Sequence, residues 1–482
     1  MWFAGWAACC GLSGTEPAVG SGTQMLFEST RGASPVVDFE AALLGGLAPD
    51  GGLYVPERWP ELNSAATADD YATTAVNVMW PYVAGSIDAD VFTAICAEAY
   101  ATFRHPAVVP LVQIDEQQWL LELFHGPTLA FKDVALQLVG RLFDHVLERR
   151  GERITIVGAT SGDTGSAAID GVRHCRNVDI IILYPEGRTS EVQRRQMTTV
   201  EADHVHTVAI DGTFDDCQDL VKAMFADRDF RERMNLSAVN SINWARVMAQ
   251  VVYYVTTSRA LSGPTSFCVP TGNFGNVLAG WIARRMGADI HRFHIASNSN
   301  DILARFVQDR DMSALDVVAT LSPSMDIQVS SNFERLLFEM NGRDGELTAA
   351  QMAAFRSEGR LDVSAAQHAE WISPVFTAGR VSDVDTLDEI ARVHADCGLL
   401  IDPHTATGTR VARAKGGDGP VVTLATAHPA KFPDAVERAT GVRPALPDGL
   451  ADLYERPERL RAMAADLALV QDFVASVSRV GR

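Results

Sequence analysis

Lys132 is the residue of this sequence best suited to covalent chemistry. It stands between Phe131 and Asp133 in the segment HGPTLAFKDVALQ, where a helix with an apolar stripe is predicted to begin. A lysine that forms a Schiff base must lose its proton, and apolar or cationic surroundings lower the lysine pKa for this purpose. The segment alone leaves a second interpretation open, because a lysine in a first helical turn is usually a solvated surface residue.

Two glycine-rich turns could hold an anion. TGNFGN (271–276) and TSGDTG (160–165) each follow a predicted strand and precede a predicted helix. Gly272 and Gly275 permit a close approach of the backbone, and a helix N-terminus favours negative charge. Neither turn has the pattern of a nucleotide P-loop or of a dinucleotide site. A plain strand-to-helix turn would explain either one alone, but two in one sheet favour a phosphorylated ligand.

The elements that must position these residues alternate between strands and helices. Residues 153–172 and 266–286 are each typical of a strand, a glycine-rich turn and a helix. Residues 178–188 and 420–432 are typical of buried strands that run into turns. This alternation predicts an α/β fold with mostly parallel sheets and helices on both faces. Ligands of such sheets bind at the carboxyl ends of the strands, where the glycine-rich turns lie.

Three regions are expected along the chain. Residues 1–24 have an apolar opening with no preceding Lys or Arg, so we interpret them as a disordered leader and not as an export signal. Residues 25–110 are predicted to form a small helical N-terminal domain, with a helical stretch at 69–83 and a turn-rich segment at 48–60. Residues 111–482 are predicted to form the catalytic region, divided into two α/β subdomains.

Composition excludes several classes of function. The 482 residues include 41 Lys and Arg against 61 Asp and Glu, a net charge of -20, which disfavours nucleic acid as a partner. No run reaches the roughly 18 apolar residues of a membrane span. An anionic small substrate stays compatible, since a few cations can reverse the field inside a cleft. The seven Cys are odd in number and lack a C-x-x-C pair, which predicts a reduced cytoplasmic protein without disulfides or a zinc site.

Several separated motifs resemble those of the threonine synthase family in order and wording. HGPTLAFKD is followed by GATSGDTG, PTGNFGN and LATAHPAKF. The similarity extends to STRG (29–32), DGGLYVP (50–56), QMTT (196–199), NSINWARV (240–247) and DPHTATG (402–408). It spans nearly the whole chain from Met25 to the end of the 430s. The Lys132 segment and the long N-terminal domain are similar to the bacterial and fungal branch of the family.

The resemblance implies a pyridoxal 5'-phosphate (PLP) enzyme of the tryptophan-synthase-β-like fold, called fold type II. Lys132 would form the aldimine with PLP, and a backbone cradle would hold the cofactor phosphate, made of Gly272, Asn273, Phe274, Gly275 and Asn276. Thr426 would face the pyridine nitrogen, where a hydroxyl keeps that nitrogen largely unprotonated. A strand-end hydroxyl bonded to local backbone is the alternative for Thr426.

Asp163 stands where many relatives of this fold carry Asn beside the 3'-oxygen of the cofactor. Two anionic oxygens repel, so we expect Asp163 to hydrogen-bond nearby backbone and to shape its turn. Ser161 and Thr164 are then expected to bind the substrate carboxylate. Arg246, with Asn243 beside it, is the first candidate for the substrate phosphate, because a guanidinium binds phosphate in a bidentate way. Further candidates for that phosphate are Arg188 and Lys431.

The reaction implied by the resemblance converts O-phospho-L-homoserine and water to L-threonine and phosphate, the last step of threonine biosynthesis, through β,γ-elimination and replacement. A phospho-lyase of the same fold that gives 2-oxobutanoate is the alternative within enzymes. A non-catalytic PLP-binding or phospholigand-binding protein is the alternative of another class, and the intact Lys132 argues against it. A monomer or a homodimer is expected.

Overall fold

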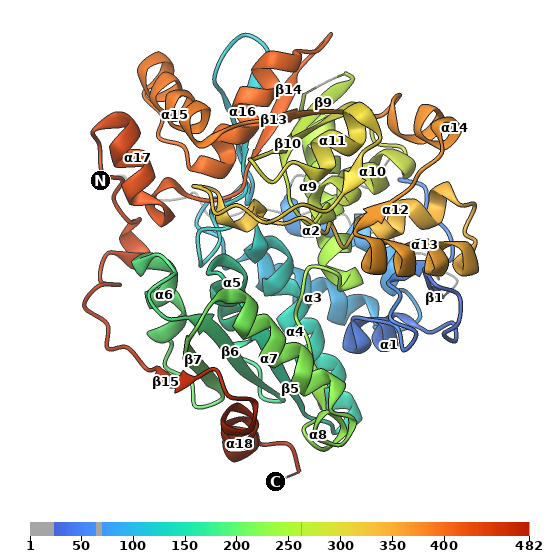
Figure 1. The fold of residues 1–482 in the computed structure, drawn as a ribbon, viewed down its shortest axis with the longest axis vertical. Coiled ribbons are helices and arrows are strands. Elements are labelled where there is room, and N and C mark those ends of the chain that lie inside the picture. Colours follow the sequence, from blue (N-terminus) through green and yellow to red (C-terminus); the bar gives the residue numbers. More distant parts are fainter. Residues whose placement is uncertain (1–23, 64–69, 262, 482) are drawn as a thin grey trace, which may run out of the picture.

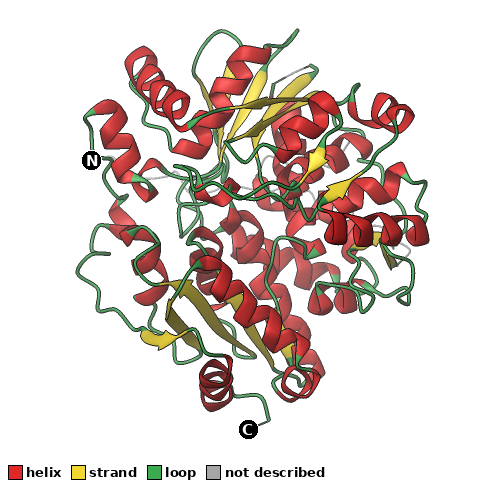
Figure 2. Cartoon of the chain, viewed as in Figure 1, coloured by secondary structure: helices red, strands yellow, loops and turns green. Residues whose placement is uncertain are grey.

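The computed structural model describes residues 24–63, 70–261 and 263–481 (Figures 1 and 2). The predicted leader therefore lies outside the described residues, apart from residue 24. Two sheets organise the described chain, and Figure 1 shows one in the upper and one in the lower half of the molecule. Figure 2 shows helices covering both of them.

The upper sheet has six strands and is parallel except at one edge. Its order is β13-β10-β9-β14-β4-β3, and only β3 runs antiparallel to its neighbour β4. In that order the strands are Phe376–Arg380, Ile290–Ser297, Thr265–Pro270, Val421–Ala425, Gln118–Glu122 and Leu111–Gln113. The helix α16 (Pro403–Lys415) packs on the central strands, and α10 (Gly275–Arg285) and α11 (Ile302–Asp309) pack against β10.

The lower sheet has five strands, all parallel. Its order is β15-β7-β6-β5-β8, with the strands Arg461–Ala464, Val205–Asp211, Val178–Pro185, Ile154–Ala159 and Leu236–Ser237. Successive side chains of a strand face opposite sides. In β6, Ile180 and Ile182 accordingly join the largest hydrophobic core, whereas Ile181 and Leu183 join a second core with α7 (Phe214–Ala226) and α18 (Leu467–Val477). The predicted fold class, with mostly parallel sheets covered on both faces, is confirmed.

The remaining elements surround the two sheets. The helices near the lower sheet are α4 (Lys132–Arg150), α5 (Asp163–Val172), α6 (Glu191–Thr198) and α8 (Arg228–Arg233). The others in the middle and upper parts are α9 (Trp244–Ala260), α12 (Phe333–Met340), α13 (Gly345–Glu358), α14 (Ala365–Gln367), α15 (Asp383–Cys397) and α17 (Pro433–Thr440). A small antiparallel pair joins β11 (Met312–Ser313) to β12 (Arg360–Leu361).

The N-terminal segment packs directly on the catalytic region. It contains the antiparallel pair β1 (Phe27–Ser29) and β2 (Tyr54–Pro56), and the helices α1 (Phe39–Gly45), α2 (Tyr71–Val83) and α3 (Ala89–Tyr100). The rings of Phe27 and Tyr82 lie 5.8 Å and 5.4 Å from the ring of Trp244 on α9, inside the largest core. The helix predicted at 69–83 is confirmed by α2, the β1–β2 pair was not predicted, and the domain boundary at residue 110 stays a prediction.

Candidate active site

Lys132 is held at the first residue of α4 by the strand end of the upper sheet. The backbone N–H of Phe131 donates to the carbonyl of Thr426 at 2.8 Å, and Ala130 and Ala427 form an isolated β-bridge. The segment after β14 thus fixes the loop that leads from β4 into α4. Only 7% of Lys132 is exposed, so the interpretation as a solvated surface lysine is wrong.

The amine of Lys132 lies among charged and polar groups from several elements. Its Nζ donates to Asp163 Oδ2 and to Ser324 Oγ, each at 3.3 Å. Burial lowers the pKa of Lys132; Asp163 opposes this effect, and the positive charges of Lys431 and Arg246 add to it. A lysine with a lowered pKa is the form that can act as a nucleophile and as a base.

Asp163 is buried at the first residue of α5, after the glycine-rich turn that follows β5. Its Oδ1 pairs with Lys431 Nζ at 2.8 Å and accepts a hydrogen bond from Gln193 Nε2 at 2.9 Å, while its Oδ2 faces Lys132. Burial alone would raise the pKa of Asp163, but the two ammonium groups hold it well below its usual range. The expectation that Asp163 bonds nearby backbone is therefore wrong, because side chains from four other elements, Ser324 among them, take its carboxylate.

Asp133, the next residue after Lys132, is also buried, but its side chain stabilises the loop that precedes α4. Its carboxylate accepts hydrogen bonds from the backbone N–H of Thr128 at 2.8 Å and from its hydroxyl at 2.7 Å. Burial and the nearby Asp170 raise the pKa of Asp133 to about 6. A carboxyl whose folded pKa is raised binds its proton more tightly in the folded state.

We expect this carboxyl to make the folded state less stable as pH rises. Its stabilisation is complete below about pH 4 and is lost as pH rises through about 6. The loss is on the order of 3 kcal/mol. Urea unfolding at pH 4 to 7 should show that Asp133→Asn removes this pH-dependent part, whereas the exposed Asp219→Asn leaves it. Equal pH slopes for the wild type and Asp133→Asn would contradict the assignment.

The 271–276 turn forms a cradle at the start of α10. Phe274 adopts φ 61°, a left-handed conformation that a bulky residue rarely takes and that is common in anion-binding turns, and its own N–H donates to the hydroxyl of Thr271 at 3.2 Å. Asn332 Nδ2 donates to the carbonyls of Asn273 and Ser241, which ties the turn to α9 and α12. A Cβ on Gly275 would lie 3.0 Å from that same Asn332 nitrogen, so a larger residue there would have to shift the Asn332 carboxamide.

The side-chain N–H group of Asn276 has no partner among the described residues. The hydroxyls of Tyr253 and Tyr254 donate to its Oδ1 at 2.6 Å and 2.8 Å, which fixes the orientation of the carboxamide. Its Nδ2 is buried and has no hydrogen-bond partner in the described part of the chain. Because buried polar groups are nearly always paired, this donor indicates an acceptor supplied by a ligand.

Arg246 shows the same signal more strongly. It is 3% exposed, and its Nε and Nη1 have no hydrogen-bond partner among the described residues. Arg246, Gln250 and Tyr253 follow each other at helical spacing on α9, and Tyr253 contacts Asn276 of the cradle. Burial lowers the pKa of Arg246 to about 10. A buried guanidinium without a counter-ion is costly, and a phosphate would satisfy both free donors.

The chain matches known families over most of its length. Residues 104–361 match the family model of pyridoxal-phosphate dependent enzymes. Residues 26–100 match the model of the threonine synthase N terminus, and residues 405–474 match that of the threonine synthase C-terminal region. Threonine synthase of Pseudomonas aeruginosa is 53% identical over 469 residues, which cover 95% of this chain and 100% of that protein. This chain belongs to the threonine synthase family.

Solved structures agree with this assignment. The crystal structure of PLP-bound threonine synthase from Brucella melitensis has a TM-score of 0.92 and 50% identity, and the match covers 95% of this chain and 100% of that one. Yeast threonine synthase has a TM-score of 0.89 and 40% identity over 94% of this chain and 98% of that one. The predicted family, its enzyme class and the PLP cofactor are confirmed.

The residues present fit the cofactor of a threonine synthase. PLP carries an aldehyde, which the buried amine of Lys132 suits, and a phosphate, which the cradle and the free amide of Asn276 suit. Thr426 follows β14, is 5% exposed, and its hydroxyl makes no hydrogen bond to a described residue. The alternative in which that hydroxyl satisfies local backbone therefore lacks support. The individual contacts of these residues with PLP stay predictions.

The residues predicted to bind substrate differ in whether their side chains are already engaged in hydrogen bonds within the protein. Ser161 and Thr164 are half-buried at the start of α5, and their contact with the substrate carboxylate stays a prediction. Asn243 caps α9, because its Oδ1 accepts from the N–H of Ala245 and its Nδ2 donates to the carbonyl of Leu43. This carboxamide holds structure together, and its predicted contact with substrate also stays a prediction.

The two further phosphate candidates have other surroundings. Arg188 is exposed on the turn after β6. Lys431 is fully buried, and its Nζ is taken by Asp163 and by the carbonyl of Thr128 at 2.7 Å. Arg246 alone among these candidates combines burial with free donors.

The prediction from sequence missed three side chains of this site. They are Gln193, Ser324 and His404, of which Ser324 lies on the 3-10 turn η1 (Pro323–Met325). The N–H of Ser324 donates to His404 Nε2 at 3.3 Å, so the proton of the imidazole is on Nδ1, which faces Asp402 Oδ2 at 2.7 Å. His404 stands inside the motif DPHTATG and could have been singled out there, whereas no motif marks Ser324.

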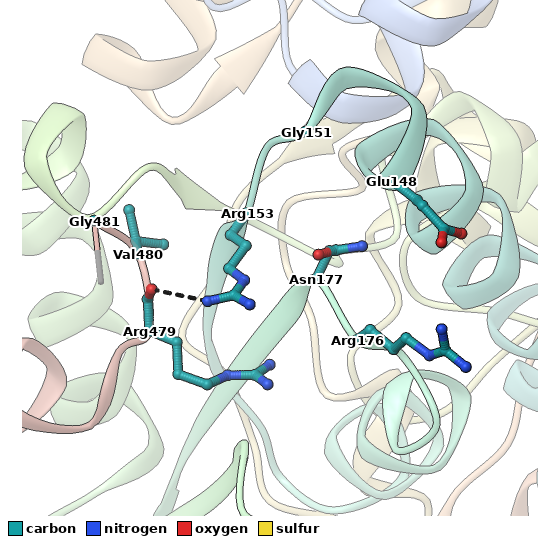
Figure 3. A pocket seen from close by; sticks show the side chains of 8 residues that line it. All are labelled: Glu148, Gly151, Arg153, Arg176, Asn177, Arg479, Val480 and Gly481. Carbon is teal, nitrogen blue, oxygen red and sulfur yellow. Dashed lines mark hydrogen bonds between the residues drawn. The ribbon is translucent and has the colours of Figure 1, made fainter.

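A cavity with a different character lies elsewhere in the described structure. It has a volume of about 520 Å³ and is lined by Glu148, Gly151, Arg153, Arg176, Asn177, Arg479, Val480 and Gly481 (Figure 3). Glu148 is sixteen residues beyond Lys132 on α4, about 24 Å along the helix. Figure 3 shows a hydrogen bond from the Arg153 guanidinium to the backbone carbonyl of Arg479, and the charged lining of the cavity consists of three arginines and the carboxylate of Glu148. It is separate from the active site.

Proposed function

We propose that this chain converts O-phospho-L-homoserine and water to L-threonine and phosphate. The observation that carries the proposal is a buried amine at Lys132 together with two sets of free anion-binding donors, one at the 271–276 cradle and one at Arg246. One phosphate belongs to the cofactor, so a second set of donors supports a substrate that is itself phosphorylated. Membership of the threonine synthase family supports the same substrate.

The cofactor would be held by Lys132, the cradle and Thr426, and it supplies an electron sink that acidifies the carbon next to the substrate amino group. Lys132 Nζ would remove the proton from that carbon and later return one to it. Ser161 and Thr164 would bind the substrate carboxylate at the start of α5, where the helix dipole favours negative charge. Arg246 would hold the phosphate until it leaves.

The polar groups around Lys132 would orient its amine toward the substrate. Ser324 Oγ lies 3.3 Å from Lys132 Nζ and 3.4 Å from Asp163 Oδ2, so it can hold the amine in place as its proton moves. His404 would fix Ser324 through the backbone hydrogen bond between them. Asp402 would hold His404 in the tautomer that accepts this bond.

The experiment is product analysis with the PLP-loaded protein and O-phospho-L-homoserine. We expect L-threonine and inorganic phosphate in equal amounts, measured by chromatography and by a phosphate assay. L-homoserine, which lacks the phosphate, is the matched control and should give no threonine. Release of phosphate with 2-oxobutanoate in place of threonine would instead identify a phospho-lyase.

We further infer that the partner is this small molecule and that the protein works in the cytoplasm as a monomer or a homodimer. Five Cys among the described residues are free, which supports a reducing compartment. No described helix is both long enough and apolar enough to cross a membrane. No group of His, Cys, Asp and Glu in the described part of the chain is arranged to hold a metal ion.

A further inference from the structure

Lys431 is a buried cation for which the reaction described above has no use. It ends the 3-10 turn η3 (Pro429–Lys431), just after β14, and none of its side chain is exposed. The chain has only four lysines, and two of them, Lys132 and Lys431, are buried in this one site. An ammonium group is expensive to bury, so its position calls for an electrostatic reason.

The carboxylate of Asp163 lies between the two ammonium groups and is shared unequally. Its Oδ1 is 2.8 Å from Lys431 Nζ, whereas its Oδ2 is 3.3 Å from Lys132 Nζ. Gln193 adds a further hydrogen bond to Oδ1. Oδ2 also accepts from Ser324 Oγ, at 3.4 Å. Because both contacts of Oδ1 are shorter than both contacts of Oδ2, most of the charge of Asp163 is compensated on the Lys431 side.

The other groups that face Lys132 do not neutralise the Asp163 carboxylate in the way that Lys431 does. From α9, Arg246 adds a positive charge; from η1, Ser324 offers a neutral hydroxyl. The ring of Phe131 lies 4.9 Å from Lys132 Nζ, and His404 on α16 contributes to lowering the pKa of Asp163. With Lys132 neutral, Asp163 and Lys431 form a balanced pair, and Arg246 is left for an anion. With Lys132 protonated, the site carries one additional positive charge.

We propose that Lys431 is a positioning residue that neutralises Asp163 and thereby leaves the amine of Lys132 free to lose its proton. The inference uses the proposed function only in taking Lys132 as the reactive amine. Without Lys431, the carboxylate of Asp163 would be left to Lys132, which would keep its proton to pair with it. Lys431 would in this way control the reactivity of Lys132 indirectly, through Asp163, without touching substrate or cofactor.

The test measures Lys132 in the cofactor-free protein, so it does not depend on turnover. Acetic anhydride labels neutral amines, and mass spectrometry of peptides gives the labelling rate of Lys132 from pH 6 to 10. The exposed Lys222 and Lys415 serve as internal references. Lys431→Gln loses the charge but can still donate to the carbonyl of Thr128, which keeps the site folded. Lys431→Arg keeps the charge and is the matched control.

In Lys431→Gln we expect the pH midpoint of Lys132 labelling to rise by one unit or more, which lowers its labelling at neutral pH by about tenfold. Lys431→Arg should label like the wild type. The double variant Asp163→Asn with Lys431→Gln should return the midpoint to the wild-type value or below it. An unchanged or lower midpoint in Lys431→Gln, or no return in the double variant, would overturn the proposal. Failure to form threonine would leave this readout intact and would count only against the proposed function.

Discussion

Replacing Lys132 with alanine is expected to abolish turnover, with phosphate release from O-phospho-L-homoserine slower by at least about 10³-fold. We propose that the amine both binds the cofactor covalently and moves the substrate proton, so a single change would remove both roles. Alanine should also remove the visible absorbance that PLP acquires when it is bound to a lysine. A phosphate assay and an absorbance spectrum of the same preparation check the two effects together.

The fold should survive this substitution. Within the described structure Lys132 makes two side-chain hydrogen bonds, each 3.3 Å long, and its pKa is already lowered by burial, so its removal relieves a buried charge. Lys222→Ala, on the surface and paired with Asp219, is the matched control and should retain full activity. Normal turnover in a folded Lys132→Ala protein would refute the catalytic assignment.

Replacing Arg246 with methionine is expected to act in opposite directions on binding and on stability. The KM for O-phospho-L-homoserine should rise by about 10²-fold or more, because a desolvated charge contact with the phosphate is lost. The free energy of unfolding without ligand should stay equal or increase by about 1–3 kcal/mol, because Nε and Nη1 are buried without hydrogen-bond partners among the described residues and methionine removes that cost. Steady-state kinetics and urea unfolding measure the two quantities.

Two further variants sharpen this prediction. Arg246→Lys keeps the charge but loses the planar pair of donors, so its KM should lie between those of the wild type and Arg246→Met. Arg188→Met changes an exposed arginine and should alter neither KM nor stability. If Arg246→Met destabilised the protein and left KM unchanged, Arg246 would be a structural residue.

Much of the fold was predictable because its signals are local. The strand, glycine-rich turn and helix predicted at 153–172 and 266–286 correspond to β5–α5 and β9–α10. Apolar runs and turn residues specify such elements over only a few neighbouring positions. The N-terminal segment was only partly predictable. Its helix α2 carries its own cap at Asp70, but its packing against Trp244 depends on residues far along the chain.

The sequence by itself determined which segments are proposed to carry the chemistry: the Lys132 loop, the 271–276 cradle and the strand end at Thr426. These depend on residue type and on the backbone conformation of a few neighbours. Only the tertiary structure decided how the charges are paired. Asp163 and Lys431 are 268 residues apart, and Ser324 reaches the site from a segment without a motif. The physical reason is that burial and charge depend on what surrounds a side chain in space, and those neighbours come from strand ends of two different sheets.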